Sequence, residues 1–363
     1  MAKQRRRYSP EEARRRKIRQ GRLYIFLILV VLCGCIWLLF SALSQIKNVK
    51  ELTVDASAYQ VLAALPTQEE LEAAQREEEI KIENEIFEQK DSYPIDMIIQ
   101  TPYCVMYDVQ GREVLYSKNA EEKAYPASTT KILTAAVMME NTDKDTVFEA
   151  GDEQNFVNPG SSLAFLNQGS RLDRDMMLDA IMLPSGNDAA YCAAAVTGRM
   201  IAENEELPAD EAVNVFINKM NEKAEEIGCK NTNFTCPDGF HNDNHYTTAM
   251  DLLRITLYSQ NFKEIAASGN KAYRDLAYLS GEQIFWNNSN KLIQRDSENY
   301  YTYATGLKTG MTDMSGYCVV ATAERFGHEL IIVCLGSETS AIRWNDTIAL
   351  FDAGFAYIKN NDN

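Results

Sequence analysis

The sequence predicts an α+β domain in which one antiparallel sheet takes strands from both ends of the chain and a helical lobe lies between them. Three observations predict this class. Strand-like alternation occurs near residues 98–116, helical periodicity fills much of residues 129–258, and strand patterns return beyond Ala272 before a last helix. The 363 residues include enough apolar side chains for one large core.

The first strand pair is predicted at residues 98–107 and 113–116, because both segments are rich in apolar and aromatic residues and Gly111 lies in their connection. The lobe that follows has apolar residues at helical spacing. Its helices are predicted over residues 129–139, 174–183, 188–202, 210–227 and 248–258.

The C-terminal part is predicted as a β-hairpin followed by a helix. Residues 317–323 and 329–335 are apolar strands, and the short connection between them contains Gly327, as in many hairpins. Residues 341–357 have the periodicity of an amphipathic helix. These segments complete the sheet and close the domain.

The N-terminal part is predicted to be a membrane anchor. Residues 1–22 form a basic tail with ten Lys and Arg residues against two glutamates, and residues 23–43 are 21 uncharged, apolar residues. Such a run crosses a hydrocarbon core of about 30 Å as a helix. We expect the tail to stay in the cytoplasm, so a single-pass anchor places the rest of the chain outside the cell membrane. A cleaved signal peptide is the alternative, but its apolar region is usually only about 7 to 15 residues long.

Residues 44–94 are predicted to be an acidic stalk, helical or disordered, because Glu, Lys, Gln and Ala dominate and apolar positions are sparse. A folded domain is expected over residues 95–358, with a polar tail at 359–363. The whole chain has a formal net charge of −16, and the basic tail contributes +8. The remaining residues therefore carry about −24. They contain no basic patch interleaved with aromatic residues, which argues against nucleic acid as a partner.

Cysteine and histidine usage predicts neither a metal site nor a cofactor. Of the six cysteines beyond the apolar run, only Cys229 and Cys236 are close enough for a local disulfide, and burial as small hydrophobes is the simpler interpretation of the others. His241 and His245 are the only neighbouring histidines, and no Cys/His cluster has the spacing of zinc ligands.

Three short motifs predict the chemistry, and the first is S-x-x-K from Ser128 to Lys131. Residues three apart on a helix lie on one face about one turn apart. A serine hydroxyl attacks a carbonyl carbon poorly until a base takes its proton, and a neutral lysine is such a base. The apolar run after the motif places Ser128 at a helix N-terminus, which favours negative charge. Burial beside a second cation, for which Lys308 is the candidate, lowers the pKa of a lysine.

The other two motifs are Ser185-Gly186-Asn187 and Lys308-Thr309-Gly310. The first lies in a loop between two apolar helices, where its side chains are placed to relay protons. On an edge strand that faces the serine, Lys308 and Thr309 would bind a carboxylate, and Gly310 would let a substrate backbone pass closely. In this order the three motifs predict one acyl-transfer site.

Copies of these motifs occur elsewhere and weaken any one of them alone. S-x-x-K recurs at residues 44–47 and 268–271, and the string from Ser268 to Asn270 repeats S-x-N. The first copy abuts the apolar run, and the second follows a short segment with polar flanks. Neither has the context of a catalytic site.

With these motifs the chain resembles the serine D-alanyl-D-alanine carboxypeptidases, the low-molecular-mass penicillin-binding proteins, over roughly residues 95–358. The similar segments are Pro126–Thr134, Leu183–Ala190, Asn244–Ala249 and Gly306–Thr312. The resemblance implies a β-lactamase/DD-peptidase-like fold. It also implies removal of the terminal D-Ala from peptidoglycan stem pentapeptides through an acyl-enzyme, with β-lactams as inhibitors.

The resemblance also implies roles for single residues. Ser128 would be the acylated nucleophile and Lys131 its base. Ser185 would pass a proton to the leaving D-alanine, and Asn187 would orient the substrate amide and Lys131. The string around His245 is expected to order a turn rather than to take part in catalysis.

The carboxylate of the substrate would be held by Lys308 and Thr309, next to Gly310. The backbone N–H groups of Ser128 and Met311 would form the oxyanion hole. Arg343 resembles a family arginine near the carboxylate site, and the alternative is a surface residue of the last helix.

Other functions share these motifs. A D,D-endopeptidase that cuts crosslinks uses the same chemistry. The commonest class of serine β-lactamase needs a deacylating glutamate, usually in an E-x-x-L-N string, and the lobe has no persuasive one. A membrane-tethered scaffold that only binds peptidoglycan is the alternative without catalysis, and it leaves the complete set of polar residues unexplained.

Overall fold

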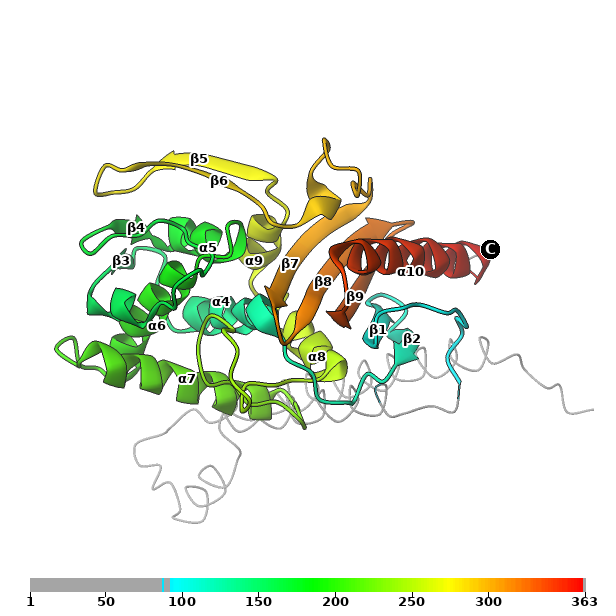
Figure 1. Cartoon of the computed structure of the whole chain (residues 1–363), viewed down its shortest axis with the longest axis horizontal. Helices are drawn as coiled ribbons and strands as arrows, with labels where there is room; N and C mark the ends of the chain where they lie inside the picture. The colour runs from blue at the N-terminus through cyan, green and yellow to red at the C-terminus, as the bar shows by residue number, and fades with distance from the viewer. Residues whose placement is uncertain (1–86, 88–91, 362–363) are drawn as a thin grey trace, which may run out of the picture. The chain divides into compact units, whose positions relative to one another are not determined.

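The computed structural model describes Phe87 and residues 92–361 (Figure 1). These residues belong to a compact unit that spans Ala74–Asn363. The predicted basic tail and apolar run, and nearly all of the predicted stalk, lie outside the described residues. In the part that is described, no helix combines the length and the apolar character needed to cross a membrane.

A five-stranded antiparallel sheet with the order β2-β1-β9-β8-β7 forms the centre of the described unit. Its strands are β1 (Tyr103–Asp108), β2 (Glu113–Lys118), β7 (Ala304–Thr312), β8 (Gly316–Arg325) and β9 (His328–Ser337). The strand β1, from the beginning of the domain, pairs with β9, from its end. The prediction that both ends of the chain contribute to one sheet is therefore confirmed, and β7 lies at an edge.

Helices cover both faces of this sheet, with α10 on one face and the helical lobe on the other (Figure 1). The helices are η1 (Ala127–Thr130), α4 (Lys131–Glu140), η2 (Asp152–Phe156), α5 (Arg174–Met182), α6 (Asn187–Ile201), α7 (Ala209–Glu226), α8 (Ala249–Ser259), α9 (Lys263–Gly269), η3 (Lys291–Ile293) and α10 (Ser340–Asn361). Side-chain caps begin three of them, because Asp173 accepts from Met176 N, Thr248 from Asp251 N and Asn290 from Leu292 N. Two small antiparallel two-stranded sheets complete the lobe: β3 (Val147–Glu149) with β4 (Arg171–Asp173), and β5 (Tyr273–Ala277) with β6 (Gln283–Asn287).

Strand alternation divides the apolar side chains between two cores. In β1, Val105 and Tyr107 belong to the core shared with the lobe, whereas Cys104 and Met106 belong to the core under α10. This division follows from the period of two along a strand. Phe87, which falls in the predicted stalk, packs its ring edge-on against Tyr107 with 5.4 Å between ring centroids.

The structure corrects some predicted boundaries. The first strand begins at Tyr103 rather than at residue 98, directly after Pro102, which has no N–H to donate to a sheet. Ser128 lies in the 3₁₀ turn η1, and the α-helix begins at Lys131. The short helix α9 was not predicted.

The described cysteines are free thiols. Cys229 donates to the backbone oxygen of Asp251 and Cys236 to that of Phe240, so this pair does not form the local disulfide considered above. Cys104, Cys192, Cys318 and Cys334 are fully buried, as predicted for small hydrophobes.

Candidate active site

The structure brings Ser128, Lys131 and Asn187 into direct contact. Lys131 Nζ lies 3.0 Å from Ser128 Oγ, 2.7 Å from Asn187 Oδ1 and 2.7 Å from the backbone oxygen of Asp238. The lysine is fully buried and the serine is half-buried. The i, i+3 spacing that predicted a shared face therefore holds, although η1 rather than an α-helix supplies it.

Burial also sets the charge properties of the two lysines of the site. Desolvation lowers the pKa of Lys131 to about 8, against the opposing influence of Asp238. Burial lowers the pKa of Lys308 well below its usual value, and the charges of Lys131 and Arg343 add to this effect. The sequence predicted that the charge of Lys308 would lower the pKa of Lys131. Instead, burial is the main cause of the lowered pKa of Lys131, and the charge of Lys131 helps to lower the pKa of Lys308.

Asp238 is a contact that sequence reasoning missed. Its backbone oxygen reaches Lys131 because the turn around it is fixed against η1 and α4: Thr134 Oγ1 donates to Pro237 O at 2.6 Å. Gly239 has φ +79°, and a Cβ there would lie 1.9 Å from the backbone oxygen of Ala127. The Pro-Asp-Gly string signals a turn in sequence, but not its location.

His245 fixes the same turn. The backbone N–H of Thr235 donates to His245 Nδ1 at 3.0 Å, so Nε2 carries the ring hydrogen and donates to Thr130 Oγ1 at 2.9 Å. Burial lowers the pKa of this histidine to about 4, which keeps the ring neutral near pH 7. The structure agrees with the prediction that His245 orders a turn.

The loop of the second motif is held in a strained conformation. Ser185 has φ +62°, and its buried hydroxyl has no hydrogen-bond partner among the described residues. Asp188 fixes the loop from the other side, because its carboxylate accepts from the backbone N–H groups of Ala164 and Leu166 at 2.8 and 2.9 Å. The Ser185 hydroxyl is therefore free to bond to a bound molecule.

The third motif lies on the edge strand β7, as predicted, and packs directly against η1. A Cβ at Gly310 would lie 2.9 Å from both the backbone nitrogen of Ser128 and the backbone oxygen of Pro126. Lys308 Nζ donates to its neighbour Thr309 O at 3.0 Å. Thr309 Oγ1 lies 2.6 Å from the hydroxyl of Ser289, a second contact that the sequence did not indicate.

Arg343 is buried behind β7, so the alternative of a surface residue is wrong. Its guanidinium lies 3.3 Å from Cys318 O and 3.5 Å from Gly310 O, and the side chain is stacked over Trp344. Within the described residues, neither Arg343 nor Lys308 forms an ion pair with a carboxylate. Both cations therefore make this end of the site attractive to an anionic group.

The second copy of S-x-N has a structural role. Ser268 Oγ donates to Asp179 Oδ1 at 2.7 Å, and Lys271 Nζ pairs with the same carboxylate at 2.6 Å. These contacts join the C-terminal end of α9 and the residues after it to α5, and they do not involve Ser128. The first copy of S-x-x-K, at residues 44–47, lies outside the described residues.

Replacing Gly310 by alanine is expected to lower the free energy of unfolding by about 1 to 3 kcal/mol, because the new methyl group meets the backbone of η1 rather than a flexible side chain. Denaturant titration of the variant and the wild type measures this difference in the free energy of unfolding. The matched control is Met311→Ala, where the side chain is 55% exposed and the expected change is within about 0.5 kcal/mol. Equal stability of Gly310→Ala and the wild type would contradict the packing argument.

The chain is similar to known proteins in sequence and in fold. The sequence profile of a family described as D-alanyl-D-alanine carboxypeptidase matches residues 90–339. The D-alanyl-D-alanine carboxypeptidase DacF of Bacillus subtilis is 32% identical over 257 residues, which cover 70% of this chain and 61% of that relative. The chain thus spans less than two thirds of the length of this relative.

Two further matches extend the comparison. The D-alanyl-D-alanine endopeptidase of Pseudomonas aeruginosa is 26% identical over 235 residues, which cover 64% of this chain and 69% of that protein. The crystal structure of the Streptomyces K15 DD-transpeptidase superposes with a TM-score of 0.65 at 28% identity, over 72% of this chain and 99% of that chain. The α+β fold class is thereby confirmed.

Proposed function

The chain belongs to the D-alanyl-D-alanine carboxypeptidase family, and on that premise we propose that it removes the terminal D-Ala from peptidoglycan stem pentapeptides through an acyl-enzyme on Ser128. The observation that carries this proposal is the buried amine of Lys131, 3.0 Å from the Ser128 hydroxyl and held by Asn187.

Acylation begins with proton transfer from Ser128 to Lys131. A neutral amine has two N–H donors and one lone pair. The side-chain oxygen of Asn187 and the backbone oxygen of Asp238 accept the two N–H groups of Lys131, and the Ser128 hydroxyl faces the lone pair. As the proton leaves, Ser128 Oγ attacks the carbonyl carbon of the penultimate D-Ala. The backbone N–H groups of Ser128 and Met311 stabilise the resulting oxyanion.

The C–N bond then breaks, and the leaving D-Ala takes a proton that Ser185 relays from Lys131. Lys308 and Thr309 hold the terminal carboxylate during this step, and the charge of Arg343 behind Gly310 strengthens the attraction. Water hydrolyses the ester on Ser128 and restores the free enzyme. The absence of a partner for the Ser185 hydroxyl among the described residues supports its part in this relay.

The test is release of D-Ala from a peptide that ends in D-Ala-D-Ala, together with mass spectrometry of protein exposed to benzylpenicillin. We expect one penicillin adduct, on Ser128, and neither an adduct nor D-Ala release after Ser128→Ala. Comparison of muropeptides from cells that carry the wild type or Ser128→Ala checks the same activity in the cell wall. A protein that releases no D-Ala and takes no adduct is a scaffold instead.

Two related activities are separated by their substrates. Rapid turnover of nitrocefin, instead of slow stoichiometric labelling, would assign the protein as a β-lactamase. Cleavage of crosslinked dimers in preference to pentapeptides would assign a D,D-endopeptidase, for which the P. aeruginosa relative is the supporting observation.

The location we propose is the outer face of the cell membrane, with a single-pass anchor at residues 23–43 and a stalk at 44–94. The uncharged run and its basic flank support this location. Membrane fractionation of the full chain, followed by protease treatment of intact protoplasts, tests it. Protection of the catalytic domain from the protease would contradict the orientation.

The rate of acylation is expected to rise with pH. Only the neutral form of Lys131 accepts a proton, and its fraction increases about tenfold per pH unit until the pH reaches its pKa of about 8. A fluorescent penicillin measures the second-order acylation rate between pH 6 and 9. A rate that does not change over this interval would show that a different group acts as the base.

A further inference from the structure

Two cysteines face each other across the central sheet, in the core under α10. Cys104 on β1 and Cys334 on β9 are directly opposite in the antiparallel register. Their sulfur atoms are 3.4 Å apart, although 230 positions separate the two residues in the sequence. Neither thiol takes part in the proposed chemistry, so the active site does not explain why the two lie together.

The backbone geometry at this position permits a disulfide. Directly opposite residues of antiparallel strands have Cα atoms about 4.5 or 5.5 Å apart, depending on whether the pair is hydrogen-bonded. Both distances fall within the range of about 4.4 to 6.8 Å that disulfides span. Bond formation therefore needs the two sulfurs to approach from 3.4 Å to about 2.05 Å by rotation of the side chains, without a change of register.

Cys318 on the neighbouring strand β8 is not a competing partner. Although β8 pairs with β9, Cys318 belongs to the core shared with the lobe, whereas Cys104 and Cys334 belong to the core under α10. The Cys318 thiol donates to the backbone oxygen of Tyr125 at 3.6 Å. Among the described cysteines, the partner that the sheet brings to Cys334 is therefore Cys104.

A buried cluster of hydrogen bonds holds the same two segments together next to the cysteines. The Thr101 hydroxyl, three residues before Cys104, lies 2.9 Å from Ser337 Oγ. The same hydroxyl and the backbone N–H of Thr101 both donate to Asp346 Oδ2 at 2.7 Å. These contacts fix the start of β1 against β9 and α10, so they keep the two sulfurs opposite each other.

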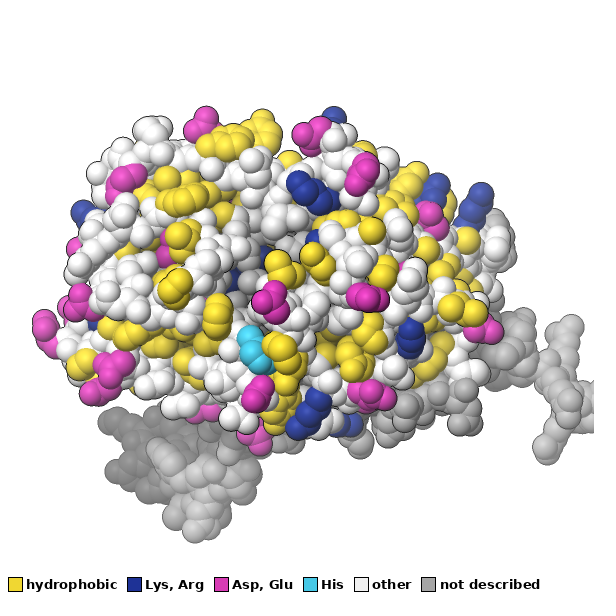
Figure 2. All heavy atoms as spheres, in the orientation of Figure 1, with side chains coloured by type: hydrophobic (Ala, Val, Ile, Leu, Met, Phe, Trp, Pro, Cys, Tyr) yellow, Lys and Arg dark blue, Asp and Glu magenta, His cyan; other side chains and the backbone are white. Residues whose placement is uncertain are grey.

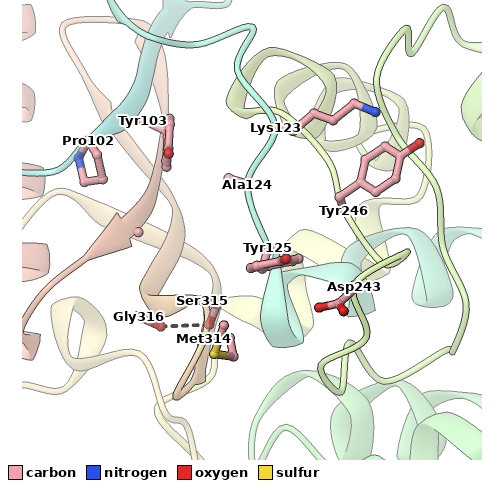
Figure 3. A pocket seen from close by; sticks show the side chains of 11 residues that line it. Pro102, Tyr103, Lys123, Ala124, Tyr125, Asp243, Tyr246, Met314, Ser315 and Gly316 are labelled. Carbon is pink, nitrogen blue, oxygen red and sulfur yellow. Dashed lines mark hydrogen bonds between the residues drawn. The ribbon is translucent and has the colours of Figure 1, made fainter.

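The folded domain closes the pair off from solvent. Both thiols are fully buried, and in Figure 2 the side chains over α10 form a closed surface. Figure 3 shows a pocket of about 460 Å³ beside Pro102 and Tyr103, but Tyr103 packs on the lobe side of the sheet and Cys104 on the other side. Burial also raises the pKa of the Cys104 thiol well above its usual value, and the thiolate is the reactive form. A disulfide here therefore forms most readily while the strands assemble, before the sulfurs are enclosed.

We propose that Cys104 and Cys334 form a disulfide that joins β1 to β9 when the chain folds in the presence of a disulfide oxidant. One cysteine thiolate attacks a sulfur of the oxidant and expels a thiolate, which gives a mixed disulfide. The second cysteine thiolate attacks the cysteine sulfur of this intermediate and expels the other half of the oxidant. The two cysteines lose two protons and two electrons, and the oxidant becomes two thiols.

This disulfide stabilises the folded domain. It joins β1 to β9 across 230 positions of sequence, and a crosslink that closes a long loop removes much conformational entropy from the unfolded chain. The supply of an oxidant rests on the proposed location outside the membrane, because disulfides persist in oxidising compartments. The bond itself does not depend on the proposed activity.

The test refolds the full chain in detergent with excess oxidised glutathione or with dithiothreitol, and then blocks the remaining thiols and digests the protein with trypsin. Cleavage places Cys104 in peptide 91–112 and Cys334 in peptide 326–343, each with no other cysteine. We expect mass spectrometry to find these two peptides linked after oxidative refolding and separate after refolding with dithiothreitol. Cysteines that stay unlinked in glutathione, or a link from Cys334 to peptide 309–325, which contains Cys318, would overturn the inference.

Thermal unfolding measures the consequence for stability. We expect the oxidised wild type to have a Tm about 5 to 10 °C above that of the reduced wild type. This difference disappears in Cys104→Ala, whereas Cys192→Ala, at another fully buried cysteine, keeps both the difference and the linked peptide. Because each variant is compared with itself in the two buffers, the effect of the substitution on stability cancels. A difference that survives in Cys104→Ala contradicts the assignment.

The outcomes separate this inference from the proposed function. If the linked peptide is found but Ser128 takes no penicillin adduct, the proposed function fails and the disulfide stands. If Ser128 takes the adduct but the two peptides stay separate after oxidative refolding, the disulfide is overturned and the proposed function is unaffected.

Discussion

Replacing Lys131 by arginine is expected to lower the acylation rate of Ser128 by about 10²- to 10⁴-fold, because a guanidinium stays protonated and cannot accept the serine proton. The positive charge remains in the site, so the loss reports proton acceptance and not the loss of a cation. The rate is measured with a fluorescent penicillin at pH 8, where the wild-type lysine is partly neutral.

Lys131→Met is the companion variant, because methionine keeps the length of the side chain in this fully buried position without the amine. We expect a similar fall in the acylation rate. It leaves the oxygens of Asn187 and Asp238 without the N–H groups of Lys131, and circular dichroism checks that the fold remains. Acylation within fivefold of the wild type in either variant, with the fold intact, would mean that another group removes the proton.

Replacing Lys308 by methionine is expected to lower kcat/KM for a peptide with a free terminal carboxylate by about 10²- to 10³-fold. The lysine is 1% exposed, and without it the carboxylate of the substrate enters a buried site that lacks its cationic partner. The loss is measured by D-Ala release at a series of peptide concentrations.

A peptide with the same sequence and a terminal carboxamide provides the internal control. Because it has no charge for Lys308 to bind, the variant is expected to cleave it as slowly as the wild type does. Lys291→Met, at an exposed lysine, is the matched protein control and is expected to leave both peptides unaffected. An equal loss for the acid and the amide would assign Lys308 to the chemical step rather than to the carboxylate.

Spacing along the sequence was sufficient to predict the contacts of the site that join residues close together in the chain. Ser128 and Lys131 meet because residues three apart share a face in any helical turn, which is true of the 3₁₀ turn as well as of an α-helix. The edge position of the third motif was expected from the part it would play opposite Ser128, since a strand pattern contains no information about its neighbours in the sheet.

Contacts between distant segments were not predictable in this way. The oxygen of Asp238 reaches Lys131 from 107 positions away, and a backbone oxygen is available at every residue, so no residue type marks it. The contacts of Ser289 with Thr309 and of Arg343 with the backbone oxygen of Gly310 also join segments that are distant in the sequence. The strained φ of Ser185 is a further case, because a serine with positive φ is held by its surroundings and not by its own preference.

The residue types of the three motifs, their order along the chain and the α+β class were thus determined by the sequence itself, because side-chain chemistry and hydrophobic periodicity are local properties. The depth at which Lys131 is buried and the shift of its pKa toward neutrality are decided only by the tertiary structure. Desolvation and cavity shape depend on atoms brought together from several segments, and no single segment contains that information.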